Sequence, residues 1–399
     1  MARLWDKGEG TDELVLAFCT GSDPELDARL VPYDVRASVA HVHMLARMGH
    51  VSNDDAARVE AAFTEIAQAH ADGQWQISRD EEDVHTALEN RLVERLGDLG
   101  KRVHLGRSRN DQVLAALRLY LDDVIGDLDA GAGSVTAALT VIETGQGQLP
   151  LPGYTHLQRA MPSSIGLWAG GFRAEIEDDR EGLRAARRRV SKNPLGSAAG
   201  YGVPDFLRLD REDTRRELGF RDVQSPVTAV QLSRGKAEAG VAFECALLQQ
   251  DLGRLAADLV LYTSAEFAFV SLPRAFTTGS SIMPQKRNPD VFELVRGRSA
   301  QAPADLQAVM AVTQKMTSGY HRDFQLTKEP LFRTIDRSLE SLAVMARALP
   351  GLVFQEDALR AAMTPDLEAT ERALKLVVEA GLPFREAYQR VAKEWSERP

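Results

Sequence analysis

The sequence predicts an all-α fold, and the spacing of its apolar residues carries that prediction. Apolar side chains recur at three- and four-residue steps through most of the 399 residues, as expected for amphipathic helices. Sustained alternation of apolar and polar residues, which marks a half-buried strand, is rare. We therefore expect long helices to dominate and strands to be few and short.

The segment between Pro226 and Pro273 has no internal proline and is the clearest predicted helix. Its apolar positions follow the 4,3,4,3 spacing of a coiled-coil seam, at Leu248, Leu252, Leu255, Leu259 and Tyr262. If helical throughout, the segment is roughly 65 to 70 Å long. A single small domain cannot cover so long a seam, so we expect a helix bundle shared between subunits. Gly235, Gly240 and Gly253 either permit close helix contacts or mark a broken start.

A second long helix is predicted from Ser108 to Gln148. Its apolar stripe comprises Val113, Leu117, Tyr120, Leu121, Val124 and Leu128. Ser108 is a candidate N-cap, because Asp111 stands where a capping box carries its acidic residue. A shorter helix from Asn53 to His70, opened by Ser52, precedes it. Together with the break at Pro350 and Gly351, these segments predict an N-terminal helical domain (1–107), a central long-helix bundle (108–350) and a short C-terminal helical domain (351–399).

Composition excludes several classes of protein. Hydrophobic residues at 44% and charged residues at 27% are typical of a globular chain. The net charge of −10 argues against a general affinity for nucleic acid or anionic membranes. Cys19 and Cys245 are far apart, which fits a reducing compartment, and no Cys or His spacing indicates a metal site. With neither a signal peptide nor an apolar run of about 18 residues, we expect a cytoplasmic protein. The charge runs Asp80–Asp83 and Arg187–Arg189 are interpreted mainly as solvated faces.

The loop from Thr277 to Asn288 has the composition of a flexible cationic turn. Small residues from Thr277 to Ser281 lead to Lys286 and Asn288. Asn288 followed by Pro289 predicts a helix start with Asn288 as N-cap. The positive end of that helix, beside Lys286, suits a carboxylate. By composition alone, an ordinary surface loop is an equally good interpretation.

Several segments resemble a known superfamily. Residues 279–288 resemble the signature loop of the fumarase/aspartase superfamily, whose members eliminate fumarate. Residues 105–113, 152–160, 193–196 and 319–329 resemble argininosuccinate lyases in particular, in the same order along the chain. The resemblance implies a three-domain lyase with a central bundle in a homotetramer, no cofactor, and cleavage of argininosuccinate to arginine and fumarate, the last step of arginine biosynthesis.

The resemblance also assigns roles to particular residues. Ser280 is the base, with neighbouring Ser281 left open as an alternative, and Lys286 and Asn288 hold substrate carboxylates. His156 is the acid-side group and is paired with Glu293. The other substrate-binding positions are Ser108, Arg109, Asn110, Thr155, Tyr320, Gln325 and Lys328. These residue types suit the reaction, which needs a base, stabilisation of a developing dianion and an acid for the leaving nitrogen.

Some segments depart from the family pattern and leave rival functions open. The N-terminal Asp6–Glu9, the segment Leu232–Lys236 and the late segment His321–Asp323 differ from the usual residues, and the chain ends earlier than relatives usually do. Asp83 and His85 match a family segment near the site, although an acidic first helical turn is the simpler explanation for them. The alternatives are adenylosuccinate lyase, aspartase, or a catalytically silent structural protein such as a lens crystallin.

Overall fold

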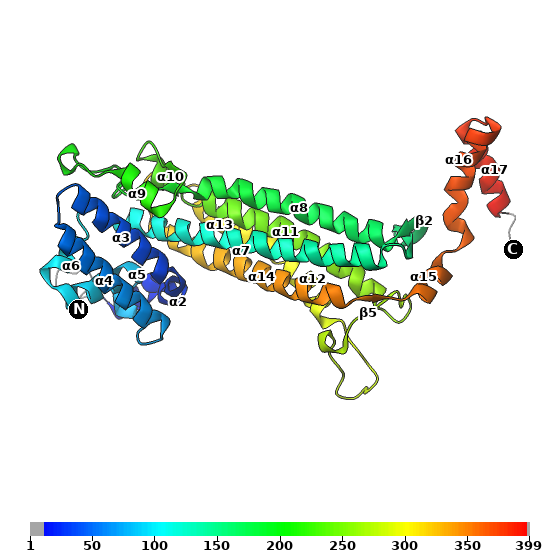
Figure 1. The fold of residues 1–399 in the computed structure, drawn as a ribbon, viewed down its shortest axis with the longest axis horizontal. Helices are drawn as coiled ribbons and strands as arrows, with labels where there is room; N and C mark the ends of the chain where they lie inside the picture. Colours follow the sequence, from blue (N-terminus) through cyan, green and yellow to red (C-terminus); the bar gives the residue numbers. More distant parts are fainter. Residues whose placement is uncertain (1–11, 397–399) are drawn as a thin grey trace. The chain divides into compact units, whose positions relative to one another are not determined.

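The computed structural model describes residues 12–396, which are predominantly helical (Figure 1). The α-helices are α1 (Glu13–Thr20), α2 (Asp23–Asp27), α3 (Val31–Arg47), α4 (Asn53–Ala71), α5 (Val84–Leu96), α6 (Asp98–Arg102), α7 (Arg109–Gln146), α8 (Ile165–Val190), α9 (Arg211–Leu218), α10 (Ala229–Leu232), α11 (Lys236–Tyr262), α12 (Asp290–Ser299), α13 (Ala302–Thr313), α14 (Lys328–Ala348), α15 (Glu356–Ala362), α16 (Ala369–Ala380) and α17 (Phe384–Ser396). The 3-10 helices are η1 (Ala28–Leu30), η2 (Arg79–Glu81), η3 (Asp205–Leu207), η4 (Arg274–Phe276), η5 (Arg322–Thr327), η6 (Leu349–Gly351) and η7 (Pro365–Glu368). The prediction of an all-α fold is confirmed.

Strands among the described residues are short and form two-stranded pairs. β1 (Pro150–Thr155) and β2 (Gln158–Ser164) form an antiparallel hairpin. β3 (Lys192–Asn193) pairs in parallel with β4 (Asp222–Val223), and β5 (Val270–Ser271) pairs antiparallel with β6 (Val353–Phe354). The expectation of few, short strands is therefore confirmed.

The chain divides into two compact units. The first contains residues up to Asp129, Glu181–Ala246 and Gln301–Arg337, and the second contains Ala130–Arg180, Leu247–Ala300 and the residues from Ser338 onward. The long helices α7, α8, α11 and α14 each contribute a segment to both units.

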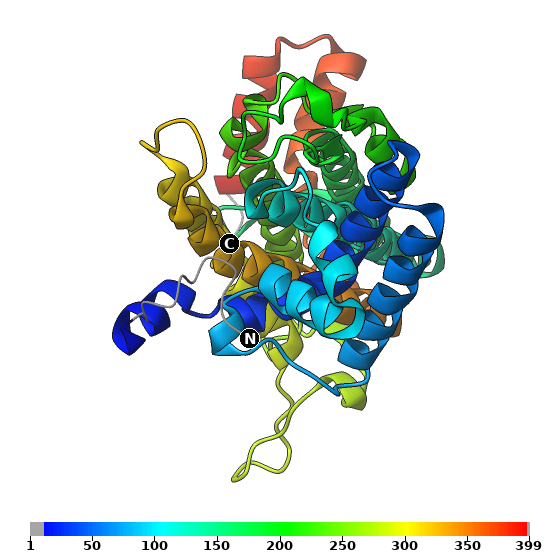
Figure 2. The ribbon, with the colours of Figure 1, turned by 90° about the vertical axis from the view of Figure 1, so that its left-hand side faces the viewer.

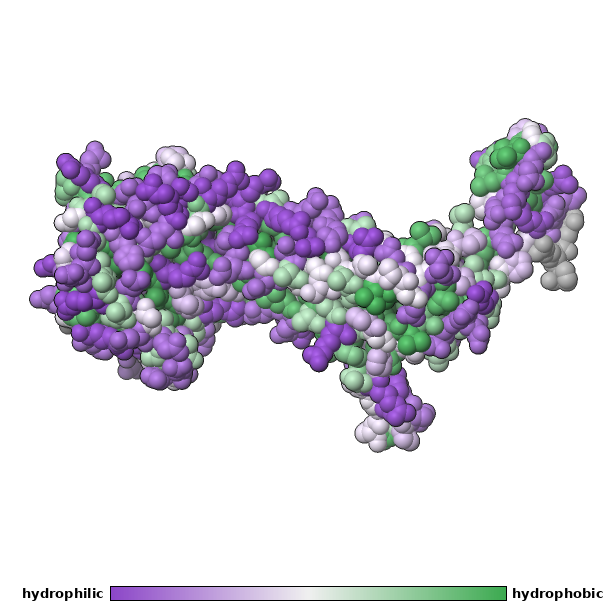
Figure 3. Space-filling view, in the orientation of Figure 1, coloured by the Kyte–Doolittle hydropathy of each residue, from purple (hydrophilic) through white to green (hydrophobic). Residues whose placement is uncertain are grey.

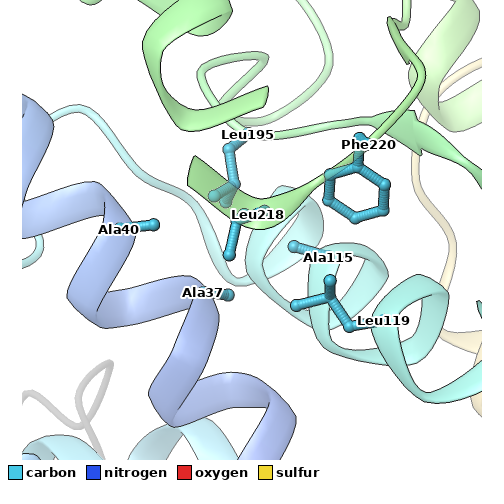
Figure 4. Packing of buried hydrophobic residues seen from close by; sticks show 7 residues of the cluster. All are labelled: Ala37, Ala40, Ala115, Leu119, Leu195, Leu218 and Phe220. Atoms are coloured by element: carbon cyan, nitrogen blue, oxygen red, sulfur yellow. The ribbon is translucent and has the colours of Figure 1, made fainter. Parts of the chain in front are cut away.

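Within the first unit, α3, α4 and α5 pack against one another (Figure 2). The predicted helix over Asn53 to His70 is confirmed as α4, and Ser52 caps it by accepting a hydrogen bond from the Asp55 N–H at 3.0 Å. A buried apolar cluster joins α3 and α7 to α9 and the segments around β3 and β4 (Figure 4); its members are Ala37, Ala40, Ala115, Leu119, Leu195, Leu218 and Phe220. This packing fixes the start of α7, which carries three predicted site residues.

The start of α7 forms as predicted. The Ser108 hydroxyl accepts from the Asn110 N–H at 3.2 Å, and the Asp111 carboxylate accepts from the Ser108 N–H at 2.9 Å. The other Asp111 oxygen accepts from the N–H groups of Gly196 and Ala198. From Leu114 to Leu121 the helix is buried on every side rather than along one stripe, because neighbouring helices surround it.

By length and composition alone, α7 could cross a membrane; its most apolar window has a mean hydropathy of 1.2 and is 44% buried. One such helix is weak support for a membrane span, because the core helix of a soluble protein passes the same test.

The segment between Pro226 and Pro273, predicted as helical, does not form one continuous helix. It is broken before Lys236 by Gly235, whose φ of 78° lies in the left-handed region. The remaining α11 has 27 residues, or about 40 Å. Its seam from Leu248 to Tyr262 is confirmed as buried.

Gly253 in α11 marks a close helix contact, as one interpretation of the sequence required. A Cβ at this position would lie 2.2 Å from the Ser299 Oγ and 2.7 Å from the Ser299 Cβ on α12. Rotating the hydroxyl cannot relieve the second contact, so α11 and α12 would have to move apart.

We expect Gly253→Ala to lower the free energy of unfolding by about 1–3 kcal/mol, although alanine favours helices. The matched control is Gly126→Ala on the exposed side of α7, where a Cβ meets nothing within 4 Å. That control should gain up to about 1 kcal/mol in urea unfolding. Equal behaviour of the two variants would contradict the close contact.

Candidate active site

In the first unit, four of the predicted substrate-binding residues line one cavity. They are Arg109 at the start of α7 and Tyr320, Gln325 and Lys328 from the segment leading into α14. The other lining residues are Asp27, Asp83, His85, Val113, Leu117 and Arg234. Segments more than two hundred residues apart in sequence thus meet at this cavity, as the shared role predicted for these residues requires.

Arg109 is held by an acidic turn. Its guanidinium lies 3.0 Å from Asp83 and 3.3 Å from Glu82, and it donates to the Thr86 hydroxyl at 3.1 Å. Burial would lower the pKa of Arg109, but Asp83 and Glu82 raise it above its ordinary value. The interpretation of this charge run as a solvated face is wrong for Glu82 and Asp83, which are buried because Arg109 neutralises them.

Lys328 is buried between two carboxylates. Its ammonium lies 2.7 Å from Asp23 and 2.5 Å from Asp27, both near the N-terminus of the described chain. Burial would lower the pKa of Lys328, but the two aspartates raise it. Burial also raises the pKa of Asp23 to about 6, against the opposing effect of Lys328. The Lys328 ammonium therefore already has two carboxylate partners within the chain.

Tyr320 and His85, two further residues that line this cavity, contact different neighbours. Tyr320 packs against Phe324 with ring centroids 6.0 Å apart. His85 is buried and pairs with Asp34, which raises the histidine pKa against the effect of burial. Both His85 and Asp83, which the sequence left as an acidic helix start, line the cavity.

Ser108 and Asn110 also lie in the first unit, at the start of α7, but do not line this cavity. The remaining predicted site residues lie in the second unit, several of them on the loop between η4 and α12. The loop closes on itself, since Thr278 and Asn288 exchange backbone hydrogen bonds at 2.9 and 3.2 Å. Inside it, the Ser280 hydroxyl accepts from the N–H groups of Met283 at 3.2 Å and Ile282 at 3.4 Å. Hydrogen bonds of this kind favour a negatively charged oxygen. Ser281 and Lys286 are exposed.

The prediction that Asn288 caps a helix is wrong. Asn288 is engaged in the bridge to Thr278, so α12 begins at Asp290 with Pro289 as its N-cap. Its first turn already carries the carboxylates of Asp290 and Glu293, and Asp290 accepts from the Thr278 hydroxyl. The positive N-terminal end of α12, which was expected to bind a substrate carboxylate, is therefore partly neutralised by the protein's own acidic groups.

His156 occupies the tip of the β1–β2 hairpin. His156 and Leu157 form its two-residue turn with φ of 53° and 58°. Both values lie in the left-handed region that such a turn requires and that side-chain-bearing residues disfavour. Thr155 and His156 are exposed, as is Glu293. No hydrogen bond or ion pair joins His156 to Glu293 within residues 12–396.

Two residues that line the cavity, Asp27 and Arg234, escaped the sequence-based prediction of the site, as did Glu82, which pairs with Arg109. Asp27 and Glu82 have no motif of their own, and their roles depend on Lys328 and Arg109 brought close by folding. Arg234 lay in a segment noted only as a departure from the family pattern. One signal was available in the sequence: neither flanking residue, Ser233 or Gly235, is an acid that could pair with the Arg234 guanidinium.

Comparison with known proteins identifies the family. The family model described as Lyase matches residues 10–304. The chain is 45% identical over 397 residues to the argininosuccinate lyase of Sorangium cellulosum (strain So ce56), covering 100% of this chain and 91% of that protein. It is 37% identical over 393 residues to the argininosuccinate lyase of Thermotoga neapolitana, covering 98% of each.

Solved structures share the fold. An EDDS lyase in complex with formate superposes with a TM-score of 0.82 at 24% identity, over 96% of this chain and 76% of that one. The class II fumarase of Schistosoma mansoni gives a TM-score of 0.77 at 17% identity, over 95% and 86%. At these identities the likeness concerns the fold alone. The full-length sequence matches decide the family: the chain belongs to the argininosuccinate lyases, carbon–nitrogen lyases of the fumarase/aspartase superfamily.

Proposed function

We propose that this protein cleaves argininosuccinate to arginine and fumarate by general acid/base β-elimination, the last step of arginine biosynthesis. The observation that carries the proposal is identity of 37% to 45% with argininosuccinate lyases along essentially the whole chain. The sister lyases and a silent structural role have no comparable support. The charged and hydrogen-bonding side chains that line the small cavity of the first unit are of the types that bind carboxylates.

Ser280 takes the proton from the carbon beside a substrate carboxylate. A serine is a poor base, so its alkoxide needs support, and the N–H groups of Ile282 and Met283 already donate to its oxygen. Ser281 receives no such hydrogen bonds among the described residues, which favours Ser280. Lys286 and Asn288 stabilise the doubly charged carboxylate that forms as the proton leaves.

His156 protonates the departing guanidino nitrogen as the carbon–nitrogen bond breaks. Glu293 pairs with it in the assembled site and fixes the tautomer of the imidazole ring. The constrained turn that presents His156 supports a functional role, because backbone strain of this kind concentrates at functional sites. Thr155, Ser108, Arg109 and Asn110 bind the succinyl half, and Tyr320, Gln325 and Lys328 bind the arginine half.

The complete site is shared by subunits of a homotetramer. His156, Lys286 and Glu293 are exposed, and their side chains make no hydrogen bond or ion pair with residues 12–396, so another copy can complete their surroundings. Helices α7, α8, α11, α12 and α13 also expose apolar side chains, at Val141, Leu167, Phe243, Leu247, Leu294 and Met310. On the face seen in Figure 3, pale and apolar patches lie among the polar ones over the region of α7 and α8. Such exposed apolar surface supports burial between copies.

We further propose that the three-domain division and a cytoplasmic location hold. The start of α7 at Arg109 and the end of η6 at Gly351 coincide with the proposed domain boundaries. The bacterial biosynthetic relatives support the location.

The decisive experiment mixes the purified protein with argininosuccinate and follows fumarate by ultraviolet absorbance. We expect fumarate and arginine in equal amounts. Adenylosuccinate and aspartate, tested in parallel, should give none. A folded tetramer that releases no fumarate from argininosuccinate would sink the proposal, and release from another substrate would identify the sister activity.

A further inference from the structure

Arg234 is a buried arginine on the cavity of the first unit to which no role has been assigned. It lies in the turn between α10 and α11 and is only 6% exposed. The next residue, Gly235, has a φ of 78°, and a Cβ there would lie 2.2 Å from the Thr313 Cγ2. The turn is thus fixed against α13, and it presents the Arg234 side chain to the cavity.

Two aromatic rings set the position of the Arg234 guanidinium. Its central carbon lies 4.7 Å from the ring centroid of Phe324 and 5.9 Å from that of Tyr320. Cation–π contacts hold the group without using its N–H groups. Arg234 is therefore attached to the segment of residues 320–328 that provides Tyr320, Gln325 and Lys328.

The hydrogen-bonding capacity of Arg234 is largely unused. Its Nε lies 3.5 Å from Glu238, yet neither Nε nor Nη1 makes a hydrogen bond with any described residue. Arg118, a second buried arginine, also acts electrostatically on Glu238, so two guanidinium groups share one carboxylate. Buried N–H groups without acceptors are costly, and a ligand oxygen would relieve that cost.

The other cations of the cavity have acceptors already. Arg109 is paired with Glu82 and Asp83, and Lys328 with Asp23 and Asp27. Arg234 differs from these two residues because neither its Nε nor its Nη1 makes a hydrogen bond with any described residue, and its contact with Glu238 is 3.5 Å long.

We propose that Arg234 binds the α-carboxylate of the arginine half of the substrate and thereby fixes which amino-acid leaving group the site accepts. This inference rests on the proposed function and deepens it. A planar guanidinium can grip a carboxylate with two parallel N–H bonds, which a lysine cannot do. Lys328, already held by two aspartates, then supports the cavity wall rather than supplying the main contact to this carboxylate.

The test compares two probes, arginine and agmatine, which is arginine without its α-carboxylate. Binding of each to the tetramer is measured by calorimetry for wild type, Arg234→Met, Arg234→Lys and the control Arg187→Met. Arg187 pairs with Asp122 away from the cavity. Wild type should prefer arginine by at least about tenfold, the contribution of a charge-assisted pair. Arg234→Met should lose that preference while its agmatine affinity stays within about threefold, which also shows that the cavity is folded.

Arg234→Lys should keep a reduced preference, and Arg187→Met should behave as wild type. An unchanged preference for arginine in Arg234→Met, in a protein whose wild type releases fumarate from argininosuccinate, overturns this inference alone. An equal loss of both affinities in Arg234→Met and Arg234→Lys also overturns it, because it indicates a merely structural role. A wild type that neither binds arginine nor releases fumarate overturns the proposed function and this inference together.

Discussion

Ser280→Ala is expected to lower kcat by about 10²- to 10⁴-fold while leaving substrate binding within about threefold, because the variant lacks the base but keeps the surrounding contacts. The Ser280 oxygen is the acceptor for the N–H groups of Ile282 and Met283. These N–H groups stabilise the charged form of the base. The methyl group of alanine can neither act as the base nor accept their hydrogen bonds. Initial rates of fumarate release and calorimetric binding of argininosuccinate to the inactive variant measure the two effects.

Ser281→Ala is the matched control for this prediction. The two serines are adjacent in one loop, and Ser281 is exposed and accepts no hydrogen bond from the described residues. Its kcat should stay within about threefold of wild type. If Ser281→Ala is the inactive variant and Ser280→Ala retains turnover, the base has been assigned to the wrong residue.

The sequence predicted those parts of the fold that local patterns determine. The capped starts of α4 and α7 and the buried seam from Leu248 to Tyr262 depend on residues close together in the chain. The break before α11 depends on packing against Thr313, and the start of α12 depends on the bridge to Thr278. Those distant contacts explain why the sequence left the broken start of α11 as one of two interpretations, and why the Asn288 cap was predicted wrongly.

The site shows the same division. Arg109, Tyr320, Gln325 and Lys328 were predicted from motifs, and they line one cavity. Asp27 and Arg234 could not be predicted, because an isolated charged residue has no pattern until folding brings its partner close. Asp23 is a further example, since its raised pKa arises from burial and from the neighbouring Asp27, while Lys328 opposes the shift.

Lys328→Met is expected to cost about 3–5 kcal/mol of folding free energy, because it leaves Asp23 and Asp27 buried without a counter-charge. Methionine fills a similar volume, so the loss reports the charge rather than a cavity. Urea unfolding of wild type and variant at pH 8 measures it. The matched control is Lys375→Met, an exposed lysine paired with Glu371 on α16, which should unfold like wild type.

The same variant should have a characteristic pH dependence. Burial raises the pKa of Asp23 to about 6 even while Lys328 opposes the shift, so removing the ammonium raises it further. A carboxyl group whose folded pKa exceeds its unfolded value favours folding below the unfolded pKa and loses that contribution as the pH rises through the folded pKa. The defect of Lys328→Met should therefore be small near pH 4, grow through about pH 6 and be largest at pH 8.

Adding Asp23→Asn and Asp27→Asn to Lys328→Met should restore most of the lost stability at pH 8, because the amides carry no charge to bury. A defect equal at both pH values, or one that the two amides leave unchanged, would show that Lys328 stabilises the fold by packing and not by neutralising these carboxylates.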